Sequence, residues 1–183
     1  EDVFNVVEKL MVNTFKNFSN KKLIFEKFPR ISYSEAMLKY GSDKPDLRNP
    51  LIINDITEVF TREDVSFEIF KKLVKNGSRV RCIVTNNTND KPRSFFDNID
   101  KWAKSEGASG LAYFTLEKDK NISARGPVGK FFSEEALLEI MKKTKCKIGD
   151  SVFMACAKQN ELEKITALAR DKIANDLNII DEN

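Results

Sequence analysis

Apolar side chains recur at helical spacing near both ends of the chain. The first set comprises Phe4, Val7, Met11, Phe15 and Phe18. The second set follows Asn160 and comprises Leu162, Ile165, Leu168, Ala169, Ile173 and Leu177. Polar side chains fall largely on the opposite sides, so each pattern indicates an amphipathic helix. We expect the first helix to span Phe4–Phe18 and Asn160 to cap the last one.

Between these helices, short apolar runs alternate with further helical patterns. Strands are predicted at 51–53, 80–84, 111–116 and 151–157, and the nearly continuous apolar run at 111–116 indicates a strand covered on both faces. Helices are predicted at 32–40, where Ser32 and Glu35 have capping-box spacing, at 94–107 and at 133–141. Segment 65–69 alternates like a strand, with a helix through Val74 as the alternative. Segment 126–132 is interpreted as a loop leading into an edge strand.

The order of these elements bounds the fold. Short strands with several tight connections favour an α+β module, and its sheet need not be parallel. We predict three parts: a first segment at 1–50, the module at 51–158 and a return helix at 159–183. The end segments would belong to a second domain into which the module is inserted. We also expect the chain to be an internal segment of a longer protein.

Composition narrows the chemistry. The 183 residues are 41% hydrophobic and 32% charged, which is typical of a globular domain. A net charge of +3 permits an RNA partner without arguing for one. The chain has no histidine, which excludes histidine-based catalysis within it. Its three cysteines stand far apart without a CxxC pair, so we predict no metal site and expect a reducing cytoplasm. No apolar run is long enough to cross a membrane.

The charged loop at 41–50 is the strongest candidate for a ligand-binding segment. It carries Ser42, Asp43, Lys44, Asp46 and Arg48 between prolines and a glycine. Two carboxylates and two cations on a proline-stiffened loop can hold a polar ligand in fixed geometry. The alternative is a solvated turn with local salt bridges, because most charges on loops are simply hydrated.

Four basic residues form a second candidate, a patch that contacts RNA phosphates. They are Arg79, Arg81, Lys91 and Arg93. Arg79 and Arg81 share one face of a predicted strand, opposite the apolar face. The alternative is that these two arginines form only the solvent-exposed side of a half-buried strand.

The run Tyr40-Gly-Ser-Asp-Lys-Pro-Asp-Leu-Arg48 resembles bacterial aspartyl-tRNA synthetases, in the segment after class II motif 2. The following sequence resembles that family's insertion module, the GAD domain, at 110–113, 126–131 and 149–153. The closing helix, with Arg170 and Leu177, resembles the return into the catalytic domain. The resemblance therefore covers essentially the whole chain.

This resemblance implies a small, mainly antiparallel sheet with helices on one face, flanked by helices of a class II catalytic domain. It implies an aspartate–tRNA ligase, which forms aspartyl-adenylate from aspartate and ATP with Mg²⁺ and transfers the aspartyl group to tRNA(Asp) or, in some members, tRNA(Asn). Full-length members are homodimers. The arginines that grip ATP lie outside this chain, so we expect no catalytic residue, no bound ATP or Mg²⁺ and no activity from the chain alone.

In that family the residues from Ser42 to Arg48 lie near the mouth of the active site, and the module lies near the acceptor arm of tRNA. Two alternatives stay open. A GAD module also occurs in an archaeal glutamyl-tRNA amidotransferase subunit, where it is thought to engage tRNA. The module can also be a structural spacer without RNA contact.

Overall fold

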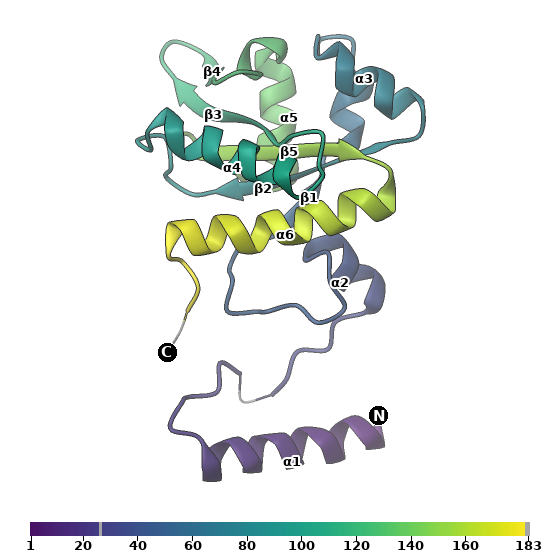
Figure 1. Cartoon of the computed structure of the whole chain (residues 1–183), viewed down its shortest axis with the longest axis vertical. Coiled ribbons are helices and arrows are strands. Elements are labelled where there is room, and N and C mark those ends of the chain that lie inside the picture. The colour runs from purple at the N-terminus through teal and green to yellow at the C-terminus, as the bar shows by residue number, and fades with distance from the viewer. Residues whose placement is uncertain (26, 182–183) are drawn as a thin grey trace.

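A five-stranded sheet forms the centre of the molecule. The computed structural model describes residues 1–25 and 27–181. In spatial order the strands are β1 (Ile53–Asp55), β2 (Arg79–Thr85), β5 (Ser151–Ala157), β3 (Ala112–Lys118) and β4 (Ile122–Arg125). All neighbouring strands are antiparallel, and Figure 1 shows this sheet at the end of the molecule opposite α1. The predicted α+β class with an antiparallel sheet is confirmed.

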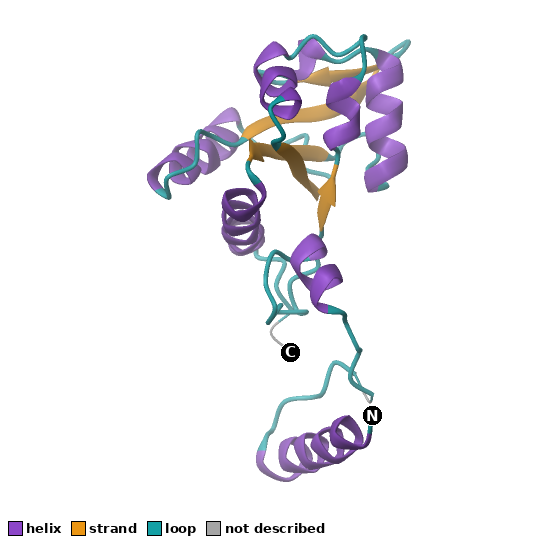
Figure 2. Ribbon diagram, turned by 90° about the vertical axis from the view of Figure 1, so that its right-hand side faces the viewer, coloured by secondary structure: helices purple, strands orange, loops and turns teal. Residues whose placement is uncertain are grey.

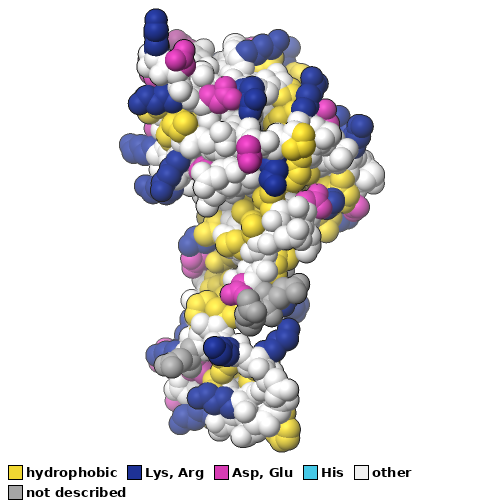
Figure 3. All heavy atoms as spheres, turned by 90° about the vertical axis from the view of Figure 1, so that its left-hand side faces the viewer, with side chains coloured by type: hydrophobic (Ala, Val, Ile, Leu, Met, Phe, Trp, Pro, Cys, Tyr) yellow, Lys and Arg dark blue, Asp and Glu magenta, His cyan; other side chains and the backbone are white. Residues whose placement is uncertain are grey.

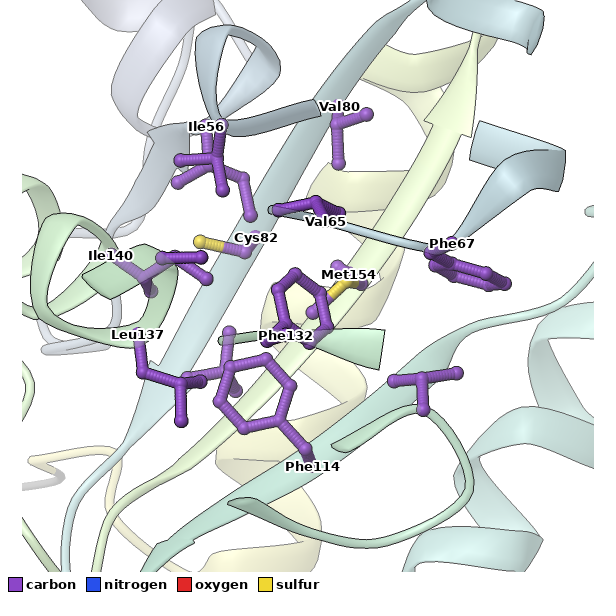
Figure 4. Close-up of a cluster of buried hydrophobic side chains, with 14 of the residues drawn as sticks. Ile56, Val65, Phe67, Val80, Cys82, Phe114, Phe132, Leu137, Ile140 and Met154 are labelled. Carbon is purple, nitrogen blue, oxygen red and sulfur yellow. The ribbon is translucent and has the colours of Figure 1, made fainter. Parts of the chain in front are cut away.

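Helices cover both faces of the sheet (Figure 2). On one face lie the 3₁₀ turn η1 (Thr57–Thr61), α3 (Glu68–Lys75) and α5 (Glu134–Thr144), around a core that Figure 4 shows. On the other face lie α4 (Arg93–Ser105) and α6 (Gln159–Leu177). The expectation that helices cover one face is therefore wrong. The central strands alternate large apolar side chains toward both sides, as Phe153 and Met154 do, and each side needs a cover.

The first part of the chain extends away from the sheet. It contains α1 (Asp2–Phe18) and α2 (Tyr33–Lys39). One half of the predicted capping box of α2 is confirmed, because Ser32 Oγ accepts from the Glu35 backbone N–H at 3.2 Å, whereas the Glu35 carboxylate accepts from Lys39 Nζ at 2.6 Å. No residue of α1 is buried, and Phe4 and Phe18 are 63% and 87% exposed. Helix α1 therefore presents its apolar stripe to solvent.

Several predicted elements differ in the structure. The strand interpretation of segment 65–69 is wrong, since Val65 makes only one bridge to Phe132 within the described residues, and its helical alternative is confirmed from Glu68, where α3 begins and runs through Val74. Continued alternation would bury Ile69, which is 65% exposed. The edge strand β4 precedes Gly126 instead of following it. Helix α6 begins at Gln159, so Asn160 lies within its first turn and does not cap it.

Helix α6 packs closely on the sheet although it follows the predicted module. Its Leu162, Ala169 and Ile173 are fully buried in the same cluster as Ile83 and Phe153. The family-based division of the chain at residues 50 and 158 stays a prediction.

Candidate functional site

The charged loop lies on the face of α6 that points away from the sheet. Gly41 opens the loop with a φ of +69°, a conformation that glycine adopts without strain. A Cβ at Gly41 would stand 2.8 Å from both Ala167 Cβ and Glu163 O. Glycine is therefore required at this position for two reasons, the conformation of the turn and the close approach to the helix.

Arg170 fixes the far end of the loop. Its side chain is 3% exposed and donates to three backbone carbonyls. The distances are 2.9 Å to Asp46 O, 2.6 Å to Asn49 O and 2.7 Å to Leu51 O. Its guanidinium carbon also stands 5.0 Å from the ring centroid of Tyr40. Burial lowers the pKa of Arg170, but arginine remains charged at neutral pH.

Asn49 completes a reciprocal contact with Arg170. Its Nδ2 donates to Arg170 O and to Asp171 Oδ1, both at 3.2 Å, while its Oδ1 accepts from the Leu51 N–H at 3.0 Å. A buried amide stabilises a fold only when its donors and acceptor are satisfied, as they are here. We call Arg170 and Asn49, with the carbonyls they bind, the loop clamp.

The candidate residues of the loop make mostly local contacts. Arg48 donates to both carboxylate oxygens of Asp46, and this guanidinium holds the pKa of Asp46 below its usual value. Ser42 Oγ accepts from the Lys44 N–H, and Lys44 Nζ stands 3.4 Å from Asp43. Three of the five residues, Asp43, Asp46 and Arg48, border a cavity of about 650 Å³.

This cavity lies between the loop and the segment that precedes α2. Its other walls are largely apolar and include Phe15, Phe25 and Phe28. Asp43, Asp46 and Arg48 therefore border a hollow whose remaining lining is apolar apart from two lysines, Lys21 and Lys22. Such a hollow suits a ligand with a few charged groups.

The four basic candidates do not form one patch. Arg79 stands at the start of β2 and pairs with Asp55, with 2.8 Å between Nη2 and Oδ2. Arg81 is 3% exposed, so the expectation that it faces solvent is wrong. Helices α2 and α6 cover it, and it donates to Met37 O at 3.1 Å and to Glu163 at 3.3 Å.

Lys91 and Arg93 lie at the opposite end of β2, where three loops converge. Asp150 joins two of these loops, because its carboxylate accepts from the backbone N–H of Asn87 and of Lys147. Arg125 joins the third by donating to Asn89 O at 2.7 Å. The exposed cations of these loops are Lys91, Arg93, Lys118, Lys120, Arg125, Lys145 and Lys147. We call this surface the basic end of the sheet.

Charge is unbalanced at the basic end. Its loops and the adjoining strand and helix ends hold seven exposed cations against five acidic residues: Asp90, Asp97, Glu117, Asp119 and the buried Asp150. Two of the acids already pair with cations of the set, Asp97 with Arg93 and Glu117 with Arg125. Lys91, Arg93 and Arg125 also line a pocket of about 460 Å³ together with Tyr113. Figure 3 views the molecule from this side, and Lys and Arg side chains stand around its upper body. The surface suits an anionic partner.

Sequence reasoning missed the cations contributed by 118–125 and 145–147, as well as the loop clamp. The basic end depends on antiparallel pairing, which brings Thr115 opposite Ser151 and Thr85 opposite Ser151. A correct pairing of the predicted strands would have exposed this convergence. The clamp joins residues more than a hundred positions apart, and no local pattern indicates it.

The described residues meet the requirements of neither a metal site nor a membrane-spanning helix. Within 1–25 and 27–181, no three His, Cys, Asp or Glu side chains converge to hold a metal ion. In the same part of the chain, no helix has the length and apolarity needed to cross a bilayer. Burial raises the pKa of all three cysteines, which indicates unreactive thiols.

An antiparallel five-stranded sheet with helices on both faces, a basic end and a clamped charged loop defines a class of small α+β domain. The GAD domain model matches residues 70–166. This match covers more than half of the chain, which therefore belongs to the GAD domain family.

The chain is also similar over its full length to curated relatives. It is 76% identical over 183 residues to the aspartate–tRNA(Asp/Asn) ligase of Pelagibacter ubique. It is 48% identical over 183 residues to the ligase of that name from Ehrlichia chaffeensis, and 46% identical over 180 residues to that of Beijerinckia indica. These alignments cover 98–100% of this chain but only 30–31% of each relative. The chain thus spans less than a third of their length.

Proposed function

We propose that the chain is the part of an aspartate–tRNA ligase that contains its insertion module and the adjoining charged loop. The observation that carries this proposal is 76% identity to such a ligase over all 183 residues, an alignment that spans the loop from Tyr40 to Arg48. The reaction joins the aspartate carboxylate to the α-phosphate of ATP with release of pyrophosphate, and then transfers the aspartyl group from the adenylate to tRNA(Asp) or tRNA(Asn) with release of AMP. ATP with Mg²⁺, a homodimeric enzyme and a cytoplasmic location belong to the same proposal.

Within this chain, the role we assign is shaping the mouth of the active site. Asp43, Asp46 and Arg48 border the 650 Å³ cavity and have the charges to orient a polar substrate at its rim. No chemical step is assigned to these residues. ATP and Mg²⁺ would be held by parts of the ligase outside this chain, since the described residues offer no acidic cluster for a metal.

A full-length ligase carrying this chain tests the proposal. We expect aspartate-dependent exchange of pyrophosphate into ATP, followed by aspartylation of tRNA(Asp) transcripts. Parallel assays with tRNA(Asn) determine whether both tRNAs are substrates. Purified, folded enzyme that shows no exchange with aspartate, while another amino acid supports exchange, would contradict the proposal.

For tRNA we propose contact at the basic end of the sheet. Lys91 and Arg93 are retained from the sequence, and Lys118 and Lys147 join them through the converging loops. Exposed cations that outnumber neighbouring acids bind RNA phosphates by releasing counterions. Arg81 is not assigned to RNA, because its guanidinium is buried against Met37 and Glu163.

Salt titration of tRNA binding tests this contact. The double variant Lys118→Gln/Lys147→Gln removes two charges that make no ion pair within the described residues. We expect it to reduce the slope of log K against log salt by about 1.8, since each duplex phosphate contact contributes about 0.9.

Lys72→Gln/Lys75→Gln is the matched control, because both lysines are exposed on α3, near the other end of β2. We expect its slope to equal that of the wild type. Equal slopes for both double variants would contradict RNA contact at the basic end and would favour a spacer role for the module.

A further inference from the structure

We propose that Arg170 is a positioning residue for the substrate-facing loop. Through the loop clamp it ties Ser42–Arg48 to α6, and thereby to the sheet on which α6 packs, so that sheet and loop move as one body. This inference rests on the proposed ligase function for its consequence, although the clamp itself is a property of the chain.

The contacts of Arg170 are suited to position rather than to charge balance. Its guanidinium donates hydrogen bonds to three backbone carbonyls in the turn between Asp46 and Leu51. Among the residues that the structure describes, its one ion pair is with Asp171, at 3.5 Å. A planar guanidinium offers five donors in fixed directions, so it orients several acceptors at once, whereas an ammonium acts as a point charge.

The backbone of the loop is also held at its start, at Gly41, and near its end, at Arg48. Gly41 lies in contact with Ala167, and the Asp181 N–H donates to Arg48 O at 3.2 Å. The backbone of the loop is thus bound at its start, middle and end to α6 and the residue stretch that follows it. The side chains of Asp43 and Asp46 border the cavity, and the position of this backbone determines where they lie.

The same helix connects the loop to the sheet. Leu162, Ala169 and Ile173 bury the opposite face of α6 on the strands, while Glu163 accepts from Arg81 of β2. Arg81 also binds Met37 O at the end of α2. Figure 1 shows α6 lying between the sheet and the loop. A displacement of the sheet therefore carries the loop with it.

Steady-state kinetics of the full-length ligase test the consequence. We expect Arg170→Met to raise KM for aspartate by about 10- to 100-fold, because a displacement near 1 Å has effects of that order. Arg170→Lys is expected to recover part of this loss, since it restores the charge and one or two donors. Asn49→Ala removes the reciprocal contact and provides a milder variant if Arg170→Met does not fold.

Ile173→Val is the matched structural control, because Ile173 lies on the same helix but faces the sheet. It lowers the melting temperature without touching the loop, so KM for aspartate is expected to stay at the wild-type value. An unchanged KM in Arg170→Met and Asn49→Ala, or an equal rise in Ile173→Val, would overturn the positioning role.

Amide hydrogen exchange separates this inference from the ligase proposal. In Asn49→Ala and Arg170→Met, the amides of 42–51 are expected to exchange about tenfold faster or more, while those of β2 and β5 keep their wild-type rates. Unchanged exchange in the loop would overturn the clamp even in an active ligase. Faster exchange in both variants of a ligase whose wild type shows no aspartate activity would instead retain the clamp and remove the proposed function.

Discussion

Arg81 of β2 donates to Glu163 of α6, with 3.3 Å between Nη2 and Oε1. The two side chains are 4% and 15% exposed, so the pair is held largely away from water. Arg81 Nε has no hydrogen-bond partner within the described residues, and the guanidinium is therefore only partly satisfied. Loss of Glu163 would leave a buried cation with a single carbonyl partner, Met37 O.

Glu163→Leu is expected to lower the free energy of unfolding by about 3 kcal/mol, the usual cost of an uncompensated buried charge. The double variant Arg81→Met/Glu163→Leu removes both charges and is expected to recover most of that loss. Urea denaturation of the chain and its variants measures both effects. A single variant as stable as the wild type, or a double variant less stable than the single one, would contradict this account of the pair.

Gly41→Ala is expected to destabilise the chain more than Gly107→Ala does. Both glycines have positive φ, +69° and +89°, so each substitution carries a conformational cost of about 1 kcal/mol. A Cβ at Gly107 meets nothing within 4 Å, whereas one at Gly41 collides with Ala167 and with Glu163 O. Overpacking adds about 1–3 kcal/mol at Gly41. Thermal or urea unfolding of the two variants measures the difference, and equal losses would count against the close packing of loop and helix.

Local sequence signals predicted a large part of this fold. The helical spacing that starts at Phe4, the cap at Ser32 and the alternation around Cys82 all depend on neighbours within a few residues. The structure bears these out as α1, α2 and β2. The short strand β4 escaped notice because it carries only four residues, half of them exposed. Its place is set by pairing with β3 and by α5 packing beside it.

The candidate site was predictable only in part. The charged loop and Lys91 with Arg93 stood out as local clusters of charge. Burial of Arg81 was not predictable from β2 alone, because α2 and α6 cover it from 44 and 82 residues away. The loop clamp joins positions 119 and 121 residues apart. Contacts at such separations follow from the assembled layers and not from spacing along the chain.

The thiols are expected to react slowly with Ellman's reagent. Burial raises the pKa of Cys156 to about 11, so only about a thousandth of it is thiolate at pH 8. Burial also raises the pKa of Cys82 and of Cys146, which are 1% and 4% exposed. We expect Cys156 to react first and Cys82 last, and full labelling of all three only after unfolding. Rapid labelling of Cys82 in native protein would contradict the packing of β2 against α5 and η1.

The last prediction concerns stability in acid. Asp64 accepts hydrogen bonds from Arg62 and from Ser133, the residue that caps α5. The Arg62 guanidinium and then the Ser133 hydroxyl lower the pKa of Asp64 from 3.8 to about 2. A carboxyl whose pKa is depressed by folding stabilises the native state above its unfolded pKa, and this contribution disappears as pH falls through the folded value. The loss is therefore expected between about pH 4 and pH 2.

Asp64→Asn removes this titration while keeping an acceptor for Ser133. Its free energy of unfolding is expected to be lower than that of the wild type at pH 6 and to approach the wild-type value near pH 2. Asp119→Asn is the matched control, since Asp119 is an exposed carboxylate on the β3–β4 turn, and it should follow the wild-type pH dependence. Urea denaturation at several pH values measures all three proteins. Parallel curves for wild type and Asp64→Asn would show that Asp64 does not couple proton binding to folding, because only a group whose pKa changes on folding makes the two curves converge.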